Sequence, residues 1–412
     1  MKVSRCKGMR DLLPEDMAKF RQVEGQFRDC CTTLGYREVR TPTLEYLYLF
    51  TATGTLTPAM LGKVYSFLDW DGWSGERVVL RPEGTIPTAR LYLEHLQDGD
   101  VARLFYVENT FTFEEAGADG RERWQCGAEL IGSDLPAADV ELITLALEVM
   151  ERLGIGPIEV RLSHAGLIRA LLAEVGLDAT AQTAVLDQVL EGNVAALGSL
   201  QTGDDNLRRA LSTLLDTRGS APGFLENVRA FLGEARPRFE ASLNNLAAIA
   251  QLLSSLGRPY HIDIASGRGF EYYTGIMFQL YHDGERLGGG GRYDELIPLV
   301  GGPPTPASGV ALYVDRLMDL VAEAGRGRPE GVLLVPQGSG LKAHGSCLEL
   351  SRLLRKAGHL AEIDLGQGQT AGHRWLLSVP EEGPLLLTDT ARGTSSEAAS
   401  WEDVAKAMEG SR

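Results

Sequence analysis

Hydrophobic and polar positions predict alternating helices and strands through the first half of the chain. Apolar residues recur with a helical period from 17 to 34, and Gly35 ends this predicted helix. Further helices are predicted over 86–96 and 139–153. Strand-like patterns cover residues 36–42, 64–68, 77–80, 102–113, 123–131 and 158–163. Residues 50–63 are rich in Thr and Gly, so we expect a loop there.

The second half of the chain begins with a helical stretch and then returns to strands. Residues 178–256 are rich in Leu and Ala and predict an inserted helical subdomain. Strands resume at 260–264, 276–281 and 310–313, a helix follows over 315–324, and residues 325–329 have the composition of a linker. Beyond it, a helix and strands at 331–336, 360–365, 375–379 and 385–387 predict a small α/β domain. We therefore expect one domain over 1–325, with its insertion at 178–256, and a second over 330–412.

Length and composition fit a globular protein of two or three domains, with 412 residues, 44% apolar and 23% charged. No window approaches 18 uninterrupted apolar residues, and the first residues lack a hydrophobic signal region, so we expect no membrane span and no secretion. Five scattered cysteines without metal-binding spacing favour reduced thiols in the cytoplasm, and neither a metal site nor a cofactor is predicted. The net charge of −16 disfavours nucleic-acid binding, because an acidic surface repels phosphates unless a basic patch is segregated from it.

Two glycine-rich segments in the second half are candidates for a ligand site. Residues 267–275 read Gly-Arg-Gly-Phe-Glu-Tyr-Tyr-Thr-Gly between two predicted strands, and 288–291 are four consecutive glycines. Glycine lets the backbone approach a ligand closely, and Arg268 with the two tyrosines would line a small polar pocket. A β-hairpin with a bulge and an ordinary glycine turn explains the same pattern. Periodicity alone leaves both interpretations open.

Five segments of the first 320 residues occur in an order that is itself informative. They are Gly8–Glu45, Arg81–Thr85, Phe111–Gly132, Arg268–Thr274 and Gly309–Leu317. In this order they resemble motif 1, the amino-acid-binding loop, motif 2, the histidine-specific segment and motif 3 of histidyl-tRNA synthetase and its non-catalytic relatives. The resemblance implies the class II synthetase fold, an α+β architecture with an antiparallel sheet flanked by helices. It also implies a homodimer with motif 1 at the interface.

The same resemblance implies a histidine-binding pocket. Its residues would be Glu83, Thr85, Gln125, Glu129, Arg268, Tyr272 and Tyr273. The chemistry is suitable, because carboxylates accept hydrogen bonds from an ammonium or a ring N–H and an arginine binds a carboxylate in a bidentate manner. Without the resemblance, Glu83 and Glu129 would be interpreted as solvated charges at strand ends.

Two departures from the enzyme pattern fall on the ATP side. The resemblance implies Phe-Arg-x-Glu in motif 2, where the arginine holds the α-phosphate, but this chain has Thr112 at that position. In motif 3, Tyr313 stands where a glycine would leave room for adenine. Arg121 and Arg316 would be the remains of a nucleotide site, and Arg121 or Arg123 is an alternative source of the missing charge. Loss of a phosphate clamp costs several orders of magnitude in rate, so we expect no catalytic residues.

The C-terminal segment also departs from a tRNA-binding domain. Residues 330–412 carry eight Lys or Arg and eleven Asp or Glu, a net charge of −3. Because tRNA binding calls for a basic surface, a degenerate anticodon-binding-like domain is the expectation.

A histidine pocket beside a damaged nucleotide site favours one group of relatives, the regulatory subunits of ATP phosphoribosyltransferase. The resemblance implies a cytoplasmic, non-catalytic subunit for the first step of histidine biosynthesis, which binds L-histidine for feedback regulation. Its partner would be the short-form catalytic subunit, in a hetero-octamer, and it would contact neither nucleic acid nor membrane. The alternative is a divergent histidyl-tRNA synthetase that forms histidyl-adenylate and charges tRNA. A structural relative without any ligand is a third hypothesis.

Overall fold

The computed structural model divides the chain into two compact units, Met1–Ala322 and Glu323–Arg412, each considered separately. The residues described are 4–54, 56, 61–70, 75–97, 101–113, 120–174, 218–219, 224–226, 229, 239–264, 272–322, 331–338, 340–366 and 373–409. The predicted insertion at 178–256 therefore lies mostly outside the described residues.

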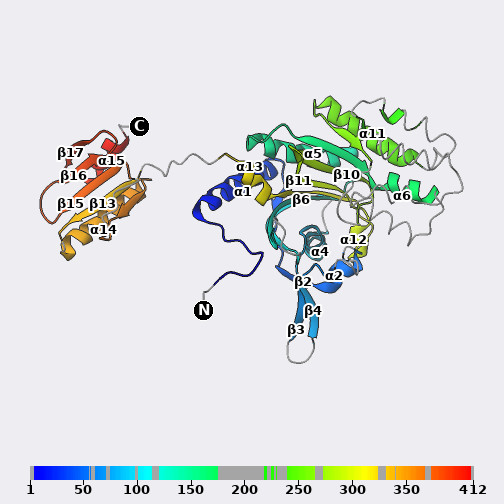
Figure 1. The fold of residues 1–412 in the computed structure, drawn as a ribbon, viewed down its shortest axis with the longest axis horizontal. Coiled ribbons are helices and arrows are strands. Elements are labelled where there is room, and N and C mark those ends of the chain that lie inside the picture. Colours follow the sequence, from blue (N-terminus) through cyan, green and yellow to red (C-terminus); the bar gives the residue numbers. More distant parts are fainter. Residues whose placement is uncertain are drawn as a thin grey trace. The chain divides into compact units, whose positions relative to one another are not determined.

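The larger unit is built on a nine-stranded sheet, and its central strands are antiparallel (Figure 1). Across the sheet the strands are β1 (Arg37–Glu38), β5 (Ala102–Phe111), β6 (Glu122–Ile131), β12 (Ala307–Tyr313), β11 (Glu285–Arg292), β10 (Ile276–His282), β7 (Glu159–His164), β9 (His261–Asp263) and β8 (Arg218–Gly219). The β1–β5 and β7–β9 pairs are parallel. The α+β fold expected from the resemblance is confirmed.

Helices cover both faces of this sheet, because its strands alternate apolar residues between two cores. One face packs against α1 (Pro14–Thr33), α5 (Pro136–Arg152), α11 (Glu240–Ser255) and α13 (Val314–Leu320). The other packs against α2 (Leu47–Ala52), α4 (Thr85–His95) and α12 (Leu296–Leu299), and α6 (Ala165–Glu174) follows β7. On β5, Leu104 belongs to the core of α4 and the adjacent Phe105 to the core of α1. The candidate site residues of β5 and β6 lie on the α4 face.

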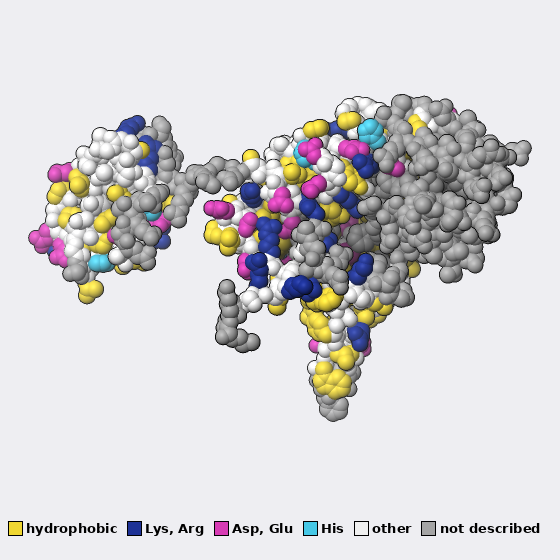
Figure 2. All heavy atoms as spheres, in the orientation of Figure 1, with side chains coloured by type: hydrophobic (Ala, Val, Ile, Leu, Met, Phe, Trp, Pro, Cys, Tyr) yellow, Lys and Arg dark blue, Asp and Glu magenta, His cyan; other side chains and the backbone are white. Residues whose placement is uncertain are grey.

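A separate three-stranded sheet, β2 (Leu44–Tyr46), β4 (Gly75–Leu80) and β3 (Ser66–Trp70), extends away from the large sheet (Figure 1). Hydrophobic side chains are visible over this extension in Figure 2. The predicted loop over 50–63 is wrong at its start, because α2 continues to Ala52 and buries Phe50.

In its described residues, the smaller unit is a five-stranded mixed sheet with two helices. Its strands run in the order β14 (Ala361–Ile363), β13 (Val332–Gln337), β15 (Trp375–Pro380), β16 (Leu385–Asp389) and β17 (Thr394–Ala398), and its helices are α14 (Leu341–Lys356) and α15 (Trp401–Glu409). Sequence patterns predicted neither β17, which is mostly exposed and polar, nor α15. In the described part of the chain, no helix is long and apolar enough to cross a membrane.

Several element boundaries differ from the predicted ones for local reasons. Helix α1 begins at Pro14, three residues before the predicted start, because proline is tolerated in the first turn and the Asp16 carboxylate accepts a hydrogen bond from the Leu13 amide (3.0 Å). Helix α13 ends at Leu320, before the predicted 324. The predicted strand over 36–42 is reduced to β1, two residues long.

The glycine run 288–291 is the interior of strand β11 and not a turn. The turn of the β10–β11 hairpin is at Asp283–Gly284, where both residues have positive φ, and a register shift follows Leu280. The expected glycine turn at 288–291 is therefore wrong, and the hairpin joins β10 to β11 and not the strands on either side of 267–275, because β9 pairs with β7 and β8. The glycines are required by close neighbours: a Cβ on Gly290 would lie 2.0 Å from the carbonyl oxygen of Gly309.

We expect Gly290→Ala to destabilise the protein by about 1–3 kcal/mol, because an added methyl group cannot fit between β10 and β12. The matched control is Gly25→Ala in the middle of α1, where an added Cβ meets nothing within 4 Å. That change should stabilise by about 0.5–1 kcal/mol through helix propensity. Urea denaturation measures both changes, and two changes of the same sign would contradict the assignment of β11.

Candidate functional site

Two buried glutamates form the centre of the candidate site. Glu83 precedes α4, and its two carboxylate oxygens accept the amides of Thr85 (2.7 Å) and Ile86 (2.8 Å), which are the first free N–H groups of that helix. Glu129 lies on β6 and accepts the hydroxyl of Thr85 at 2.9 Å. Glu83 is 3% exposed and Glu129 is 1% exposed, so neither is a solvated charge at a strand end. Thr85 connects the two carboxyl groups.

Tyr106 fills the space between the two glutamate-bearing segments. It lies on β5, and its hydroxyl donates to Glu129 at 3.2 Å and accepts the side-chain amide of Gln125 at 3.5 Å. A Cβ on Gly84 or Gly127 would lie 2.3 Å or 2.1 Å from this ring. The two glycines are thus required at these positions so that Tyr106 can reach Glu129.

A group of three tyrosines forms a second wall of the site. The Tyr272 and Tyr273 rings lie 5.1 Å apart, and Tyr293 packs edge-on against Tyr272 at 5.4 Å. The Tyr293 hydroxyl donates to Glu129. A Cβ on Gly309 would collide with Glu129 and the Tyr293 hydroxyl, so that glycine leaves room for their hydrogen bond.

Burial sets the electrostatics of this site. Desolvation raises the pKa of Glu83 to about 7 and that of Glu129 to about 8, against the hydrogen bonds that favour the charged forms. Repulsion from Glu83 also raises the pKa of Glu129, and repulsion from Glu108 raises the pKa of Glu83. Within the described residues, the hydrogen bonds that the two glutamates accept come from backbone amides and hydroxyls, which carry no charge. Near neutral pH the pair retains a proton, and a cation between the two groups would favour its release.

A buried ion pair holds the loop that carries Glu83. The Arg81 guanidinium lies 2.9 Å from the Glu108 carboxylate, and both side chains are almost fully buried. Arg81 also donates to the carbonyls of Thr41 (2.8 Å) and Asn109 (2.7 Å), while Glu108 accepts the amide and the hydroxyl of Thr41. These contacts join three segments that are distant in sequence. Arg81, at their centre, lies two residues before Glu83.

The predicted site residues fall into three groups in the structure. Glu83, Thr85, Gln125, Glu129, Tyr272 and Tyr273 are brought together on the α4 face, by the hydrogen bonds and the ring contacts given above. Arg268 lies outside the described residues. Arg121 and Arg316 have other neighbours: Arg121 stacks on Phe113 at 4.4 Å, and Arg316 lies 4.0 Å from Glu285.

Thr112 and Tyr313, the two departures from the enzyme pattern, both lie beside strand β6. The Thr112 hydroxyl is buried and has no hydrogen-bond partner within the described ranges, and it carries no positive charge. Tyr313 pairs in register with Gln125 and lies 5.7 Å from the Arg286 guanidinium. The two substitutions therefore lie at the ends of β5 and β12, beside the strand that carries Gln125 and Glu129.

Sequence reasoning missed Tyr106 and Tyr293 as members of the site. Tyr293 belongs to the Gly-Arg-Tyr-Asp sequence that follows the glycine run, and this sequence could have indicated that Tyr293 is a site residue. Tyr106 lies in a continuous apolar strand pattern, and its role depends on β5–β6 pairing, in which it faces Gly127.

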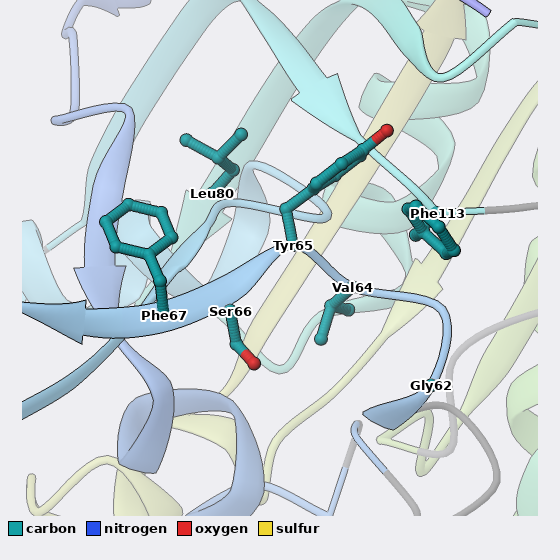
Figure 3. A pocket seen from close by; sticks show the side chains of 7 residues that line it. All are labelled: Gly62, Val64, Tyr65, Ser66, Phe67, Leu80 and Phe113. Carbon is teal, nitrogen blue, oxygen red and sulfur yellow. The ribbon is translucent and has the colours of Figure 1, made fainter. Parts of the chain in front are cut away.

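A shallow hollow of about 370 Å³ lies at the base of the three-stranded sheet (Figure 3). Its lining residues are Gly62, Val64, Tyr65, Ser66, Phe67, Leu80 and Phe113. The Arg121 guanidinium donates to the Tyr65 hydroxyl at 3.3 Å beside it. In the described ranges, no group of three or more His, Cys, Asp or Glu could hold a metal ion.

Comparisons with known proteins agree with this geometry. The histidyl-tRNA synthetase family model matches residues 8–317. An ATP phosphoribosyltransferase regulatory subunit from Dehalococcoides mccartyi is 52% identical over 389 residues, or 94% of each chain. A histidine–tRNA ligase from Archaeoglobus fulgidus is 33% identical over 374 residues, or 89% of this chain and 86% of the other. A solved structure from Bacillus halodurans, described as an ATP phosphoribosyltransferase regulatory subunit/histidyl-tRNA synthetase, has a TM-score of 0.78 at 25% identity and covers 93% of this chain and 100% of its own.

The antiparallel sheet, the paired carboxylates and the family match define a protein of the histidyl-tRNA synthetase type. Within this class, identity is higher to the regulatory subunit, at 52%, than to the ligase, at 33%. The chain belongs to the family of ATP phosphoribosyltransferase regulatory subunits, as its departures from the enzyme pattern predicted.

Arg81→Met should destabilise the protein by about 3–5 kcal/mol, because it leaves the Glu108 carboxylate buried without its cation. The double change Arg81→Met with Glu108→Leu should recover part of this loss, since it removes the unpaired charge. Chemical denaturation of both variants measures the difference. A double variant less stable than the single one would show that the pair is not the main constraint on this loop.

Glu129→Gln should reduce the pH dependence of stability. A carboxyl with its pKa raised from 4.5 to about 8 binds more protons folded than unfolded, so the wild-type free energy of unfolding falls as pH rises through this window. The effect is on the order of 1.4 kcal/mol for each pKa unit. Denaturation between pH 5 and pH 8 should give a smaller slope for the variant. The exposed control Glu397→Gln should keep the wild-type slope, and equal slopes for both variants would contradict the raised pKa.

Proposed function

We propose that this chain is the non-catalytic regulatory subunit of ATP phosphoribosyltransferase and that the Glu83–Glu129 site binds L-histidine for feedback regulation. The observation that carries the proposal is a pair of buried carboxylates that, within the described residues, accept hydrogen bonds from uncharged donors. Such a pair is costly to ionise until a cationic ligand arrives. The α-ammonium group and the ring N–H of histidine are donors of the required kind.

The surroundings of the carboxylates support a small aromatic zwitterion as the ligand. Tyr272, Tyr273 and Tyr293 present ring faces and edges beside Glu129, and such rings favour an imidazole or a cation. In this proposal the ammonium lies near Glu83 and Gln125, and a ring N–H of histidine donates to Glu129. Arg268 binds the ligand carboxylate, as the resemblance implies.

Regulation requires that histidine bind two states of the assembly with unequal affinity. The loop that carries Glu83 is tied through Arg81 to Thr41 and Asn109. A ligand that binds Glu83 therefore contacts a loop that Arg81 connects to Thr41, in the region that resembles motif 1. This connection supports a regulatory role.

The proposed partners follow from the family. The chain would associate with the short-form catalytic subunit in a hetero-octamer, and with a second copy of itself as a dimer. It would act in the cytoplasm, in agreement with five free cysteines, of which four are buried. We interpret residues 330–412, with their net charge of −3, as a degenerate anticodon-binding-like domain that does not bind tRNA.

The alternative, an active histidyl-tRNA synthetase, has weaker support. It requires a phosphate-binding cation at motif 2, where the structure has the uncharged Thr112. Arg121, the nearest substitute, is stacked on Phe113 and hydrogen-bonded to Tyr65.

The experiment has a binding arm and a catalytic arm. Isothermal titration of the purified chain should detect histidine binding, and Glu129→Gln should weaken the affinity at least tenfold, because a charge-assisted hydrogen bond contributes about 1.5–3 kcal/mol. Histamine, which lacks the carboxylate, separates the contribution of Arg268 from that of the glutamates. Glu397→Gln is the control for a glutamate outside the site.

ATP–pyrophosphate exchange with histidine should be absent, and the chain should activate the catalytic subunit in a way that histidine suppresses. Absence of histidine binding at millimolar concentration would overturn the ligand assignment. Clear exchange activity would instead favour the ligase.

A further inference from the structure

Six positions on the α4 face of the large sheet lie in two adjacent rows across β6, β12 and β11. One row is Glu129, Gly309 and Gly291, and the other is Gly127, Ala311 and Gly289. All six share the face of Glu129, because alternate residues of a strand point to the same side and paired residues face the same way. Ala311 is partly exposed although β12 is an interior strand, so solvent reaches the middle of this floor of small residues.

Aromatic side chains surround the floor. A Cβ on Gly291 would lie 2.9 Å from the Tyr273 ring, and a Cβ on Gly127 would collide with the Tyr106 ring. Tyr313 lies two residues beyond the exposed alanine on the same strand and therefore on the same face. The opening over the floor is thus enclosed by rings on several sides.

A guanidinium group reaches the same face from the start of β11. A Cβ on Gly289 would lie 3.1 Å from Nη2 of Arg286, so glycine at this position lets the guanidinium lie against the strand. The same group lies 5.7 Å from the centre of the Tyr313 ring. Burial raises the pKa of Tyr273 and the Arg286 charge acts against this rise, in agreement with a charge close to the Tyr273 hydroxyl. Arg286 therefore adds a positive charge to the wall of the opening.

The guanidinium and the nearer carboxylate lie over different corners of the floor. Glu129 lies over Gly309, and Arg286 lies over Gly289. With a rise of about 3.3 Å per residue and about 4.8 Å between strands, these two positions are about 8 Å apart. A hydrogen bond of about 2.9 Å at each end leaves room for a short molecule that is positive at one end and negative at the other. An amino acid that donates to Glu129 would have its carboxylate on the side of Arg286.

We propose that Arg286 binds the carboxylate of the amino acid in this site and makes the site selective for ligands that carry a free α-carboxylate. The inference rests on the proposed histidine site and adds a second cation to it, beside the one that the resemblance assigns to Arg268. Guanidinium and carboxylate groups form paired, charge-assisted hydrogen bonds. A ligand without a carboxylate gains nothing from Arg286, so this residue determines specificity.

Isothermal titration with L-histidine and with L-histidinamide tests this role. The amide keeps the ammonium group and the ring of histidine but replaces the carboxylate by an uncharged group. The wild-type chain should bind histidine more tightly than histidinamide, and Arg286→Gln should reduce this preference about tenfold or more, because a charge-assisted pair is lost. The affinity for histidinamide should remain nearly unchanged.

Arg161→Gln is the matched control. Arg161 on β7 also stacks on a tyrosine, Tyr281, at 4.1 Å, and it lies in the row of Gly289 two strands away. Its charge is neutralised by the Glu159 carboxylate at 2.8 Å. This variant should keep the wild-type preference for histidine, and circular dichroism checks that each variant is folded.

Arg286→Lys is a second variant that retains the positive charge. It should reduce the preference by a smaller factor, because an ammonium group cannot form two parallel hydrogen bonds. An unchanged preference in the Arg286 variants, or an equal loss of affinity for histidine and histidinamide, would overturn the role of Arg286 and leave the histidine site intact. Absence of histidine binding by the wild-type chain would overturn the histidine site and this role together.

Discussion

The ion pair between Arg81 and Glu108 is the constraint on which the candidate site depends. It is buried, and its hydrogen bonds join the segment after β1, the end of β4 and the middle of β5. A buried pair stabilises little compared with apolar packing, but loss of either partner leaves an uncompensated charge. The pair therefore fixes the relative position of these segments, and Glu83 follows two residues later.

Glycine residues are the second constraint, because the tyrosines of the site pack into space that a Cβ at these positions would occupy. Gly84 and Gly127 admit the ring of Tyr106, and Gly309 admits the Tyr293 hydroxyl beside Glu129. The run 288–291 allows β11 to lie close to both of its neighbours. Both tyrosine hydroxyls that reach Glu129 therefore depend on a missing Cβ in a neighbouring segment. A methyl group at any of these positions would change the site without changing its functional groups.

The same fold supports different functions through a few charges at one site. The paired carboxylates and tyrosines remain together on the α4 face, while motif 2 has lost its cation at Thr112 and motif 3 has gained the Tyr313 ring. If the carboxylate pair binds histidine as proposed, the uncharged Thr112 at the motif 2 position suits the site to sensing. The identity of 52% to a regulatory subunit agrees with membership of that family.

Sequence patterns and motifs alone predict several long elements of the larger unit and most members of the site. Helical and strand periods located α4, α5, β5, β6 and β7 closely, because both faces of the sheet are covered and apolar patterns are strong there. Ordered motifs identified Glu83, Thr85, Gln125, Glu129, Tyr272 and Tyr273 as neighbours. The three-dimensional structure was needed to show that 288–291 form a strand, that Tyr106 and Tyr293 reach Glu129, and that Glu108 neutralises Arg81. These features depend on strand register and on the space between segments far apart in sequence, and local hydrophobic patterns carry no information on either.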